Sequence, residues 1–275
     1  MKILHTRSND GSKLRLGRWN DEHGKRDVLL VHGLAEHLGR YEFIGNFLAE
    51  RGWRVTLVEL RGHGKSDGRR GHVDMWIRYV EDIQAAMGTV GRPMAIVAHS
   101  MGGLATLHTM MHSLTPKVNC VALSNPLLGL FMPPHPIKEQ AGRFLSKVLP
   151  WLSLPNEVLP ENLCRDSEIV KKYIDDPLCY STITARWGRE MLHAKEAAHH
   201  YAPKYKLPLL MQIGGCDRIC APESAREFMK NYASGHDASL GEVREYPFAY
   251  HELFNEPERE DILENMSNWL QAHFE

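Results

Sequence analysis

Ser100 lies in a short stretch whose composition suits a nucleophile. Residues 96–105 read IVAHSMGGLA, so an apolar run precedes Ser100, and Gly102 and Gly103 follow it. A serine on a sharp strand-to-helix turn needs small neighbours two positions away on either side, because larger side chains would collide with the strand and the helix. Ala98 stands where the G-x-S-x-G pattern has its first glycine, and adds only one methyl group. The stretch indicates a nucleophile, and the alternative is that small residues merely allow close packing here.

A serine hydroxyl is a weak nucleophile and needs a base, which in turn needs an acid to orient it. Where such a turn carries the serine, the acid and the histidine follow it in that order along the chain. Asp217 comes after the apolar run 209–213 and two glycines, and His251 comes after the run 242–246 and a short loop. Taken alone, Asp217 could be an ordinary turn residue, and His251 could be a loop residue or a helix-capping residue. Together, in the required order, they predict a catalytic triad of Ser100, Asp217 and His251.

Acyl transfer also needs two backbone N–H groups that face the developing oxyanion, and the loss of one such donor costs about 3 kcal/mol. The residue after the serine supplies one of them, which here is Met101. The second is expected from the loop after the third strand, which reads HGLAEH at residues 32–37 and makes Leu34 the candidate. A plain turn, with Gly33 needed only for a positive φ, is the alternative for this loop.

The elements that must position these residues alternate along the chain. A hairpin is expected at 3–8 and 13–19, and further strands at 28–31, 54–60, 94–98, 118–124, 209–213 and 242–246. Helices are expected at 41–51, 76–87, 101–112, 222–232 and 258–274. This alternation predicts an α/β protein with a mostly parallel sheet covered on both faces.

The alternation stops between Asn125 and Lys206, where prolines cluster and no clear β run occurs. About 80 residues are too many for a bare loop, so this segment is predicted to be a helical insertion. We therefore expect three parts: the first part of the core at 1–125, a helical cap or lid at 126–206, and the second part of the core at 207–275.

Several motifs together carry a family resemblance. The stretches VHGLAEHLGRY, ELRGHGKSDGRRGHVD, AHSMGG, DRICAPESA and AYHELFNE resemble the α/β-hydrolases of the monoacylglycerol lipase and lysophospholipase family, of the serine aminopeptidase S33-like, Hydrolase_4 type. Within the insertion, NPLLGLFMPP, LCRDSEIVKKYIDDPL and ITARWGREML are similar to the cap of that family. The resemblance covers nearly the whole chain. It departs from the family pattern at Ala98 and at Leu34, which replaces a smaller residue.

This resemblance implies the α/β-hydrolase fold, with an eight-stranded, mostly parallel sheet, flanking helices and a helical cap over the active site. It also implies that the enzyme is a serine hydrolase of carboxylic esters of single-chain lipids. We expect it to convert monoacylglycerol to glycerol and fatty acid through an acyl-enzyme on Ser100. A lysophospholipase or a general carboxylesterase of similar mechanism is the alternative. In a different class, a non-catalytic hydrolase-fold binding protein would lack a triad member, and none is missing.

Residues 136–154 have apolar side chains at helical spacing on one face, among them Phe144, Leu145 and Val148. Such a face usually packs on a core. In a lipid hydrolase it would instead line an acyl tunnel or contact a lipid surface. We take Phe144, Leu145, Val148 and Trp187 as candidate substrate-binding residues.

Composition excludes several other functions. The net charge of −1 gives no support for nucleic-acid binding. No apolar run reaches the roughly 18 residues of a membrane span, so we expect a soluble cytoplasmic protein, with peripheral membrane contact through the cap left open. The spacing of the five cysteines matches no metal site, and no cofactor is expected. GHGKS at 62–66 is not a phosphate loop, because Glu59 occupies the place of its first glycine.

Overall fold

One sheet organises the molecule. The computed structural model describes residues 1–91, 93–112, 118–133, 135–235 and 240–274. Eight strands form this sheet in the order β1-β2-β4-β3-β5-β6-β9-β10. They are β1 (Lys2–Arg7), β2 (Lys13–Trp19), β3 (Arg26–Val31), β4 (Trp53–Glu59), β5 (Met94–His99), β6 (Val118–Ser124), β9 (Leu209–Gly214) and β10 (Gly241–Tyr246). The architecture is the expected eight-stranded sheet of an α/β-hydrolase.

The pairing of the strands explains where the site lies. β1 pairs antiparallel with β2, and β2 with β4, whereas the pairs β3–β4, β3–β5, β5–β6, β6–β9 and β9–β10 are all parallel. The chain leaves β3 for β4 on one side and returns to β5 on the other, so the strand order reverses between β3 and β5. In open α/β sheets, ligands bind outside the carboxyl ends of the strands at such a reversal. His32 follows β3 and Ser100 follows β5 at this edge.

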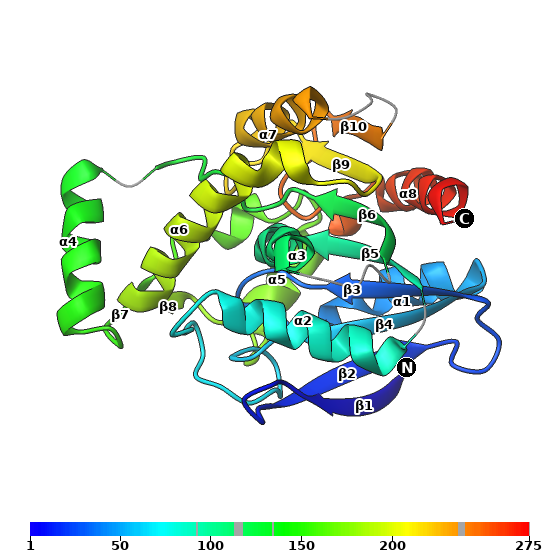
Figure 1. The fold of residues 1–275 in the computed structure, drawn as a ribbon, viewed down its shortest axis with the longest axis horizontal. Coiled ribbons are helices and arrows are strands. Elements are labelled where there is room, and N and C mark those ends of the chain that lie inside the picture. Colours follow the sequence, from blue (N-terminus) through cyan, green and yellow to red (C-terminus); the bar gives the residue numbers. More distant parts are fainter. Residues whose placement is uncertain (92, 113–117, 134, 236–239, 275) are drawn as a thin grey trace.

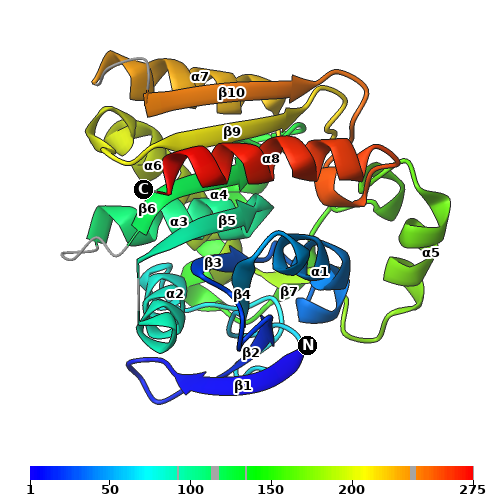
Figure 2. The same ribbon diagram turned by 90° about the vertical axis from the view of Figure 1, so that its right-hand side faces the viewer.

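Helices cover both faces of the sheet (Figures 1 and 2). One hydrophobic cluster joins the sheet to α2 (Ile77–Val90), α3 (Ser100–His112), α6 (Ala185–Tyr201) and α7 (Pro222–Ser234). A second cluster joins the opposite face to α1 (Glu42–Glu50) and α8 (Arg259–His273). The strands between them are buried on both sides, and every residue of β5 is buried. This explains why the central strands are almost continuously apolar.

The segment between β6 and β9 adds no strand to this sheet in its described residues. It contains α4 (Pro136–Val148), α5 (Ser167–Asp175), α6 and two short strands, β7 (Ser153–Pro155) and β8 (Thr182–Thr184). The expectation that it has no β structure was therefore wrong in detail, because β7 and β8 pair antiparallel. Strands of three residues are too short to leave a periodic pattern in a sequence. The first helix ends at Val148 and not near residue 154, as the following Pro150 requires.

Short 3₁₀ helices complete the connections: η1 (Leu38–Tyr41), η2 (Pro160–Asn162), η3 (Ala202–Lys204) and η5 (Leu253–Asn255). In Figure 1, α4 stands at the margin of the molecule, and α6 lies between it and the rest of the fold. Among the described helices, none is long and apolar enough to cross a membrane.

Candidate active site

Ser100 occupies a strained turn between β5 and α3. Its φ is +51°, in the left-handed region that residues with a Cβ rarely adopt. A Cβ on Gly102 would collide with the carbonyl oxygen of His32, and one on Gly103 would lie 2.8 Å from Cβ of Pro126. Both glycines are therefore required by close approach of the helix to its neighbours. This local geometry places the serine hydroxyl at the edge of the sheet, at the end of β5.

Ala98, the departure from the glycine pattern, sits in the regular part of β5. It pairs with Val31 on one side and Leu123 on the other, and only 1% of its surface is exposed. Its methyl group belongs to the hydrophobic cluster shared with α2 and α3. The elbow therefore accommodates the extra methyl as part of the core.

The three predicted triad residues lie within hydrogen-bonding distance of one another. Ser100 Oγ is 3.0 Å from Nε2 of His251, and Nδ1 of His251 is 2.7 Å from Oδ2 of Asp217. The other carboxylate oxygen of Asp217 accepts the backbone N–H groups of Ile219 and Cys220 at 2.7 and 2.9 Å. Because the carboxylate only accepts, Nδ1 of His251 carries the proton and Nε2 accepts from the serine hydroxyl. This is the tautomer that a general base requires.

The loop that carries His251 is held by Asn125, which follows β6. The Asn125 side-chain amide donates to the carbonyl of His251 at 2.7 Å and to that of Tyr250 at 3.1 Å. Its oxygen accepts the N–H of Gly214, at the end of β9, at 2.8 Å. One side chain thus fixes the histidine loop to the strand that leads to Asp217.

The electrostatics of the site favour a protonatable histidine at position 251. Burial by itself lowers the pKa of His251, but the charge and hydrogen bond of Asp217 raise it, and the net pKa lies above the ordinary value. The neighbouring His99 has no such partner, and burial together with the charge of His251 lowers its pKa to about 4. His99 therefore stays neutral near pH 7, and donates from Nδ1 to the carbonyl of Ser124 at 3.0 Å.

The loop after β3 lies directly against the nucleophile. A Cβ on Gly33 would be 3.2 Å from Cβ of Ser100, and the N–H of Gly33 donates to Oε1 of Glu36 at 2.5 Å. Leu34, the next residue, lines the cavity beside Ser100. Met101 is the second residue of α3, where backbone N–H groups have no partner within the helix. The two residues expected to bind the oxyanion are thus placed next to Ser100.

A buried arginine joins this loop to the histidine loop. Arg40 donates to both carboxylate oxygens of Glu252 at 2.6 and 2.8 Å, and to Glu36 at 3.0 Å. Its side chain is 9% exposed, and those of Glu36 and Glu252 are 5% and 6% exposed. Burial raises the pKa of Glu252, but the Arg40 guanidinium outweighs it and holds this pKa at about 2. One guanidinium therefore binds two buried carboxylates, those of Glu252 beside His251 and of Glu36 beside Gly33, and keeps Glu252 ionised.

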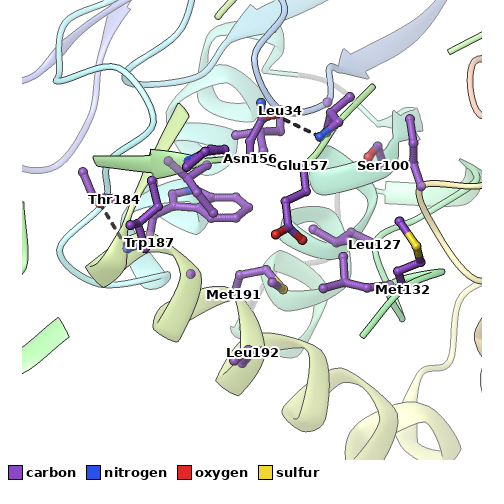
Figure 3. Close-up of a pocket in the computed structure, with 18 of the residues that line it drawn as sticks. Leu34, Ser100, Leu127, Met132, Asn156, Glu157, Thr184, Trp187, Met191 and Leu192 are labelled. Carbon is purple, nitrogen blue, oxygen red and sulfur yellow. Dashed lines mark hydrogen bonds between the residues drawn. The ribbon is translucent and has the colours of Figure 1, made fainter. Parts of the chain in front are cut away.

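A cavity of about 550 Å³ opens above Ser100 (Figure 3). Its floor contains Ser100, Leu34 and His251, and its roof comes from the segment between β6 and β9. Most of the lining is apolar, and includes Leu127, Leu130, Leu145, Ile183, Trp187 and Met191. A nucleophile below an apolar cavity of this size suits an ester with a hydrocarbon chain.

Two of the four expected substrate-binding residues line this cavity, and two do not. Leu145 and Trp187 are in its wall, and the buried Trp187 also donates from Nε1 to the hydroxyl of Tyr79 at 3.0 Å. Phe144 and Val148 are absent from the wall and are 65% and 52% exposed. Phe144 and Val148 therefore stay candidates for contact with a lipid surface and not for the cavity wall. The side of α4 that carries Ala141 and Leu145 faces the cavity. The packing of α4 against α6 determines this orientation, which the sequence pattern does not show.

Sequence reasoning missed the charged residues of the site. Glu36 and Glu252 stand within the motifs HGLAEH and AYHELFNE, and their place beside the catalytic loops was the available signal. Glu157, Arg189 and Arg218 also line the cavity, and no pattern in the sequence marks them.

Two groups of described side chains have donor atoms close enough to hold a metal ion: His37 with Asp176 and Cys179, and His251 with Asp217 and Cys220. Both ring nitrogens of His37 and both of His251 already have hydrogen-bond partners. Neither histidine directs an unused lone pair at a metal, and the second group is the triad itself.

Comparison with known proteins agrees with this site. The model of the family Hydrolase_4, described as serine aminopeptidase, S33, matches residues 22–258. Phospholipase YtpA of Bacillus subtilis is 27% identical over 89% of this chain and 95% of its own length. The monoacylglycerol lipase of Mycolicibacterium smegmatis is 29% identical over 90% of this chain and 88% of its own length. The crystal structure of the Paleococcus ferrophilus monoacylglycerol lipase superposes with a TM-score of 0.85 and 28% identity, over 99% of this chain and 100% of that one.

Proposed function

Because the chain belongs to the serine aminopeptidase S33 (Hydrolase_4) family, we propose that it hydrolyses monoacylglycerols to glycerol and fatty acid through an acyl-enzyme on Ser100. The relatives confirm the expected serine ester hydrolase of the monoacylglycerol lipase type. The observation that carries the proposal is the hydrogen-bonded series Ser100–His251–Asp217 at the floor of an apolar cavity.

The geometry supports a two-step acyl transfer. Nε2 of His251 takes the proton of Ser100 Oγ as this oxygen attacks the ester carbonyl, and Asp217 stabilises the imidazolium that forms. The N–H groups of Leu34 and Met101 bind the oxyanion of the tetrahedral intermediate. The C–O bond to the alcohol then breaks, and His251 protonates the departing oxygen. Water, deprotonated by His251, attacks the acyl-enzyme and releases the fatty acid together with Ser100.

The first experiment combines labelling with a substrate panel. We expect a fluorophosphonate to label the wild-type enzyme and not the Ser100→Ala variant, and this substitution to lower kcat on 1-monododecanoylglycerol by about 10⁶-fold. The panel then compares monoacylglycerols with nitrophenyl esters of increasing chain length. A sharp preference for acetyl over medium-chain esters would defeat the lipid assignment. Labelling that persists in Ser100→Ala would defeat the acyl-enzyme.

A lysophospholipid is the second candidate substrate. Three arginines, Arg143, Arg189 and Arg218, line the cavity and would suit the phosphodiester of such a lipid. Lysophosphatidylcholine with the same acyl chain is the discriminating member of the panel. A kcat/KM at least tenfold above that of the monoacylglycerol would favour this second candidate.

We further infer that residues 126–206 form a cap that touches lipid surfaces. An exposed apolar patch on this segment supports the proposal, and consists of Phe144 (65% exposed), Val148 (52%), Leu149 (54%) and Trp151 (63%). Lys147 lies within the same stretch and would favour an anionic surface. We expect the enzyme to sediment with vesicles that contain phosphatidylglycerol, and the variant Phe144→Ser/Trp151→Ser to sediment less. Equal sedimentation of the two proteins would reject the contact.

A further inference from the structure

The carboxyl end of β6 lies between the strands that lead to Ser100 and to Asp217, because β6 pairs with β5 on one side and with β9 on the other (Figure 1). Asn125 is the first residue after β6, and only 3% of its surface is exposed. Its φ is +42°, in the left-handed region that asparagine adopts more readily than most residues. β6 thus ends, at the edge of the sheet where Ser100 lies, in a backbone conformation that suits asparagine.

The side-chain amide of Asn125 uses its donors and its acceptor on the segments that carry the base and the acid. Nδ2 donates to the carbonyls of His251 and Tyr250, and Oδ1 accepts the N–H of Gly214. Only this orientation of the amide fits, since a carbonyl accepts and an N–H donates. The two segments approach so closely that a Cβ on Gly214 would lie 2.2 Å from the carbonyl oxygen of Tyr250. Asn125 therefore links them where their backbones are in contact.

The neighbours of Asn125 bind the segment that carries the nucleophile. The N–H of Leu127 donates to the carbonyl of Ser100 at 3.0 Å. Nδ1 of His99 donates to the carbonyl of Ser124, also at 3.0 Å. Residues 124–127 thus contact the elbow, the histidine loop and the end of β9.

We propose that Asn125 is a positioning residue, whose two donated hydrogen bonds hold the main chain of His251 at the distance from Ser100 that proton transfer requires. This inference rests on the proposed function, and it adds that the base is placed from the end of β6 as well as by the acid. Asp217 binds the ring of His251, whereas Asn125 binds its carbonyl, so the two residues fix different parts of the base. A displacement of about 1 Å at a reacting group can cost about 10²-fold in rate.

Asn20 provides a matched control away from the site. Its φ is +54°, and its amide donates to the carbonyls of Ala49 and Trp53 at 3.2 Å each. Asn20 follows β2, which runs antiparallel to β4, so it lies at the edge of the sheet opposite to Ser100. Asn125→Gly and Asn20→Gly both remove an amide without backbone strain, because glycine adopts a positive φ at no steric cost.

We expect Asn125→Gly to lower kcat on 1-monododecanoylglycerol by about 10- to 100-fold. KM should change less than about threefold, since Asn125 does not line the cavity. Fluorophosphonate labelling should slow by the same factor as kcat, whereas Asn20→Gly should change neither rate by more than about threefold. Asn125→Asp keeps the size and the acceptor but has at most one O–H to donate, so its kcat should fall by at least about fivefold.

The pH profile separates positioning from a loss of stability. Burial lowers the pKa of His251, but Asp217 raises it above its ordinary value, with smaller contributions from Glu252 and Glu36. His99 also lies against the ring, at 4.7 Å between ring centres. Asn125→Gly loosens the contact of the ring with Asp217, so the midpoint of kcat/KM should move to lower pH. The midpoint of Asn20→Gly should equal that of the wild type.

An Asn125→Gly variant that folds and keeps kcat and labelling within about threefold of the wild type would overturn the inference. So would an equal loss of kcat in Asn20→Gly, a loss confined to KM, or an unmoved midpoint. Full activity of Asn125→Asp would overturn it too, and this variant decides if Asn125→Gly does not fold. If the wild type is labelled but does not hydrolyse monoacylglycerols, the proposed substrate fails, and the rate of labelling still tests Asn125.

Discussion

Among the described residues, an Asp–His pair lies at the edge of the sheet beside Ser100, and another of nearly equal length joins the loop after β3 to the residue that follows α5. Nδ1 of His251 lies 2.7 Å from Asp217, and Nε2 of His37 lies 2.8 Å from Asp176. A cysteine stands close to each pair. Their chemistry nevertheless differs, and the difference lies in the second ring nitrogen of each histidine.

The second ring nitrogen of His251, Nε2, faces the hydroxyl of Ser100, whereas the second ring nitrogen of His37, Nδ1, is hydrogen-bonded to the backbone. Nδ1 of His37 accepts the N–H of Gly39 at 3.1 Å, so Nε2 carries the proton and donates to Asp176. This histidine has no nitrogen left to take a proton from a substrate or a serine. The side chain of Asp176 is also 27% exposed, against 1% for Asp217. An Asp–His distance thus does not define a catalytic pair, which depends on what the remaining nitrogen faces.

The strongest test of this comparison replaces each aspartate by asparagine. We expect Asp217→Asn to lower kcat by about 10⁴-fold, because the amide no longer holds the productive tautomer of His251. Asp176→Asn, the matched control, should lower it less than about fivefold, as a partly exposed pair contributes about 1 kcal/mol or less. Steady-state hydrolysis of a soluble monoacylglycerol measures both. A loss of 100-fold or more in Asp176→Asn would mean that the cap pair also serves the reaction.

The next test removes Arg40, whose side chain contacts residues near both histidines. Arg40 binds Glu252 beside His251, and its guanidinium lies 4.8 Å from the ring centre of Tyr173, near the end of α5. Arg40→Leu leaves two buried carboxylates without a counter-charge, and should lower the free energy of unfolding by about 3–5 kcal/mol in urea titrations.

Arg51→Leu is the control for Arg40→Leu. Arg51 pairs with Glu264 across the surface, where the side chains are 30% and 47% exposed, so its loss should cost about 1 kcal/mol or less. If both variants lost the same stability, the Arg40 cluster would not be the buried connection between the cap and the catalytic loops.

A smaller effect is expected from a change of pH on kcat/KM. The pKa of His251 lies above its ordinary 6.5, and only the neutral imidazole acts as a base. kcat/KM should therefore be full at pH values above this raised pKa and fall about tenfold per pH unit below it, with the midpoint above pH 6.5.

Asp176→Asn should leave the midpoint of this profile unchanged, because His37 takes no part in proton transfer. Asp217→Asn should move the midpoint to lower pH, since the carboxylate that favours the imidazolium is gone. A wild-type midpoint below pH 6.5 would contradict the assignment of His251 as the base held by Asp217.

The smallest effect is predicted for Ala98→Gly. The methyl group of Ala98 is packed in the core, so its removal should destabilise the protein by about 1 kcal/mol and change esterase turnover less than tenfold. Thermal unfolding and turnover of a nitrophenyl ester measure the two quantities. A turnover that rises tenfold or more in a normally folded variant would mean that the elbow is hindered by alanine.

The proximity of the three residues proposed for catalysis was predictable from the sequence, because their signals are local and their positions are linked by the sheet. Ser100, Asp217 and His251 each follow a strand, and the carboxyl ends of parallel strands meet at one edge. Their order along the chain therefore implied their proximity in space. No comparable rule applies to residues 126–206. Helical spacing shows that α4 has an apolar face, but it does not identify what that face contacts.

Phe144 and Glu157 mark the limit of prediction from sequence. Phe144 was expected in an acyl tunnel or at a lipid surface and lies outside the cavity wall. Glu157 carried no periodic or motif signal and lies in that wall. The sequence by itself determined the succession of strands and helices, the turn at Ser100 and the residues proposed as base and acid, because these follow from residue types at fixed offsets from strand ends. Only the tertiary structure decided which side of the cap faces Ser100 and which carboxylates surround it, because those depend on how segments distant in the chain pack together.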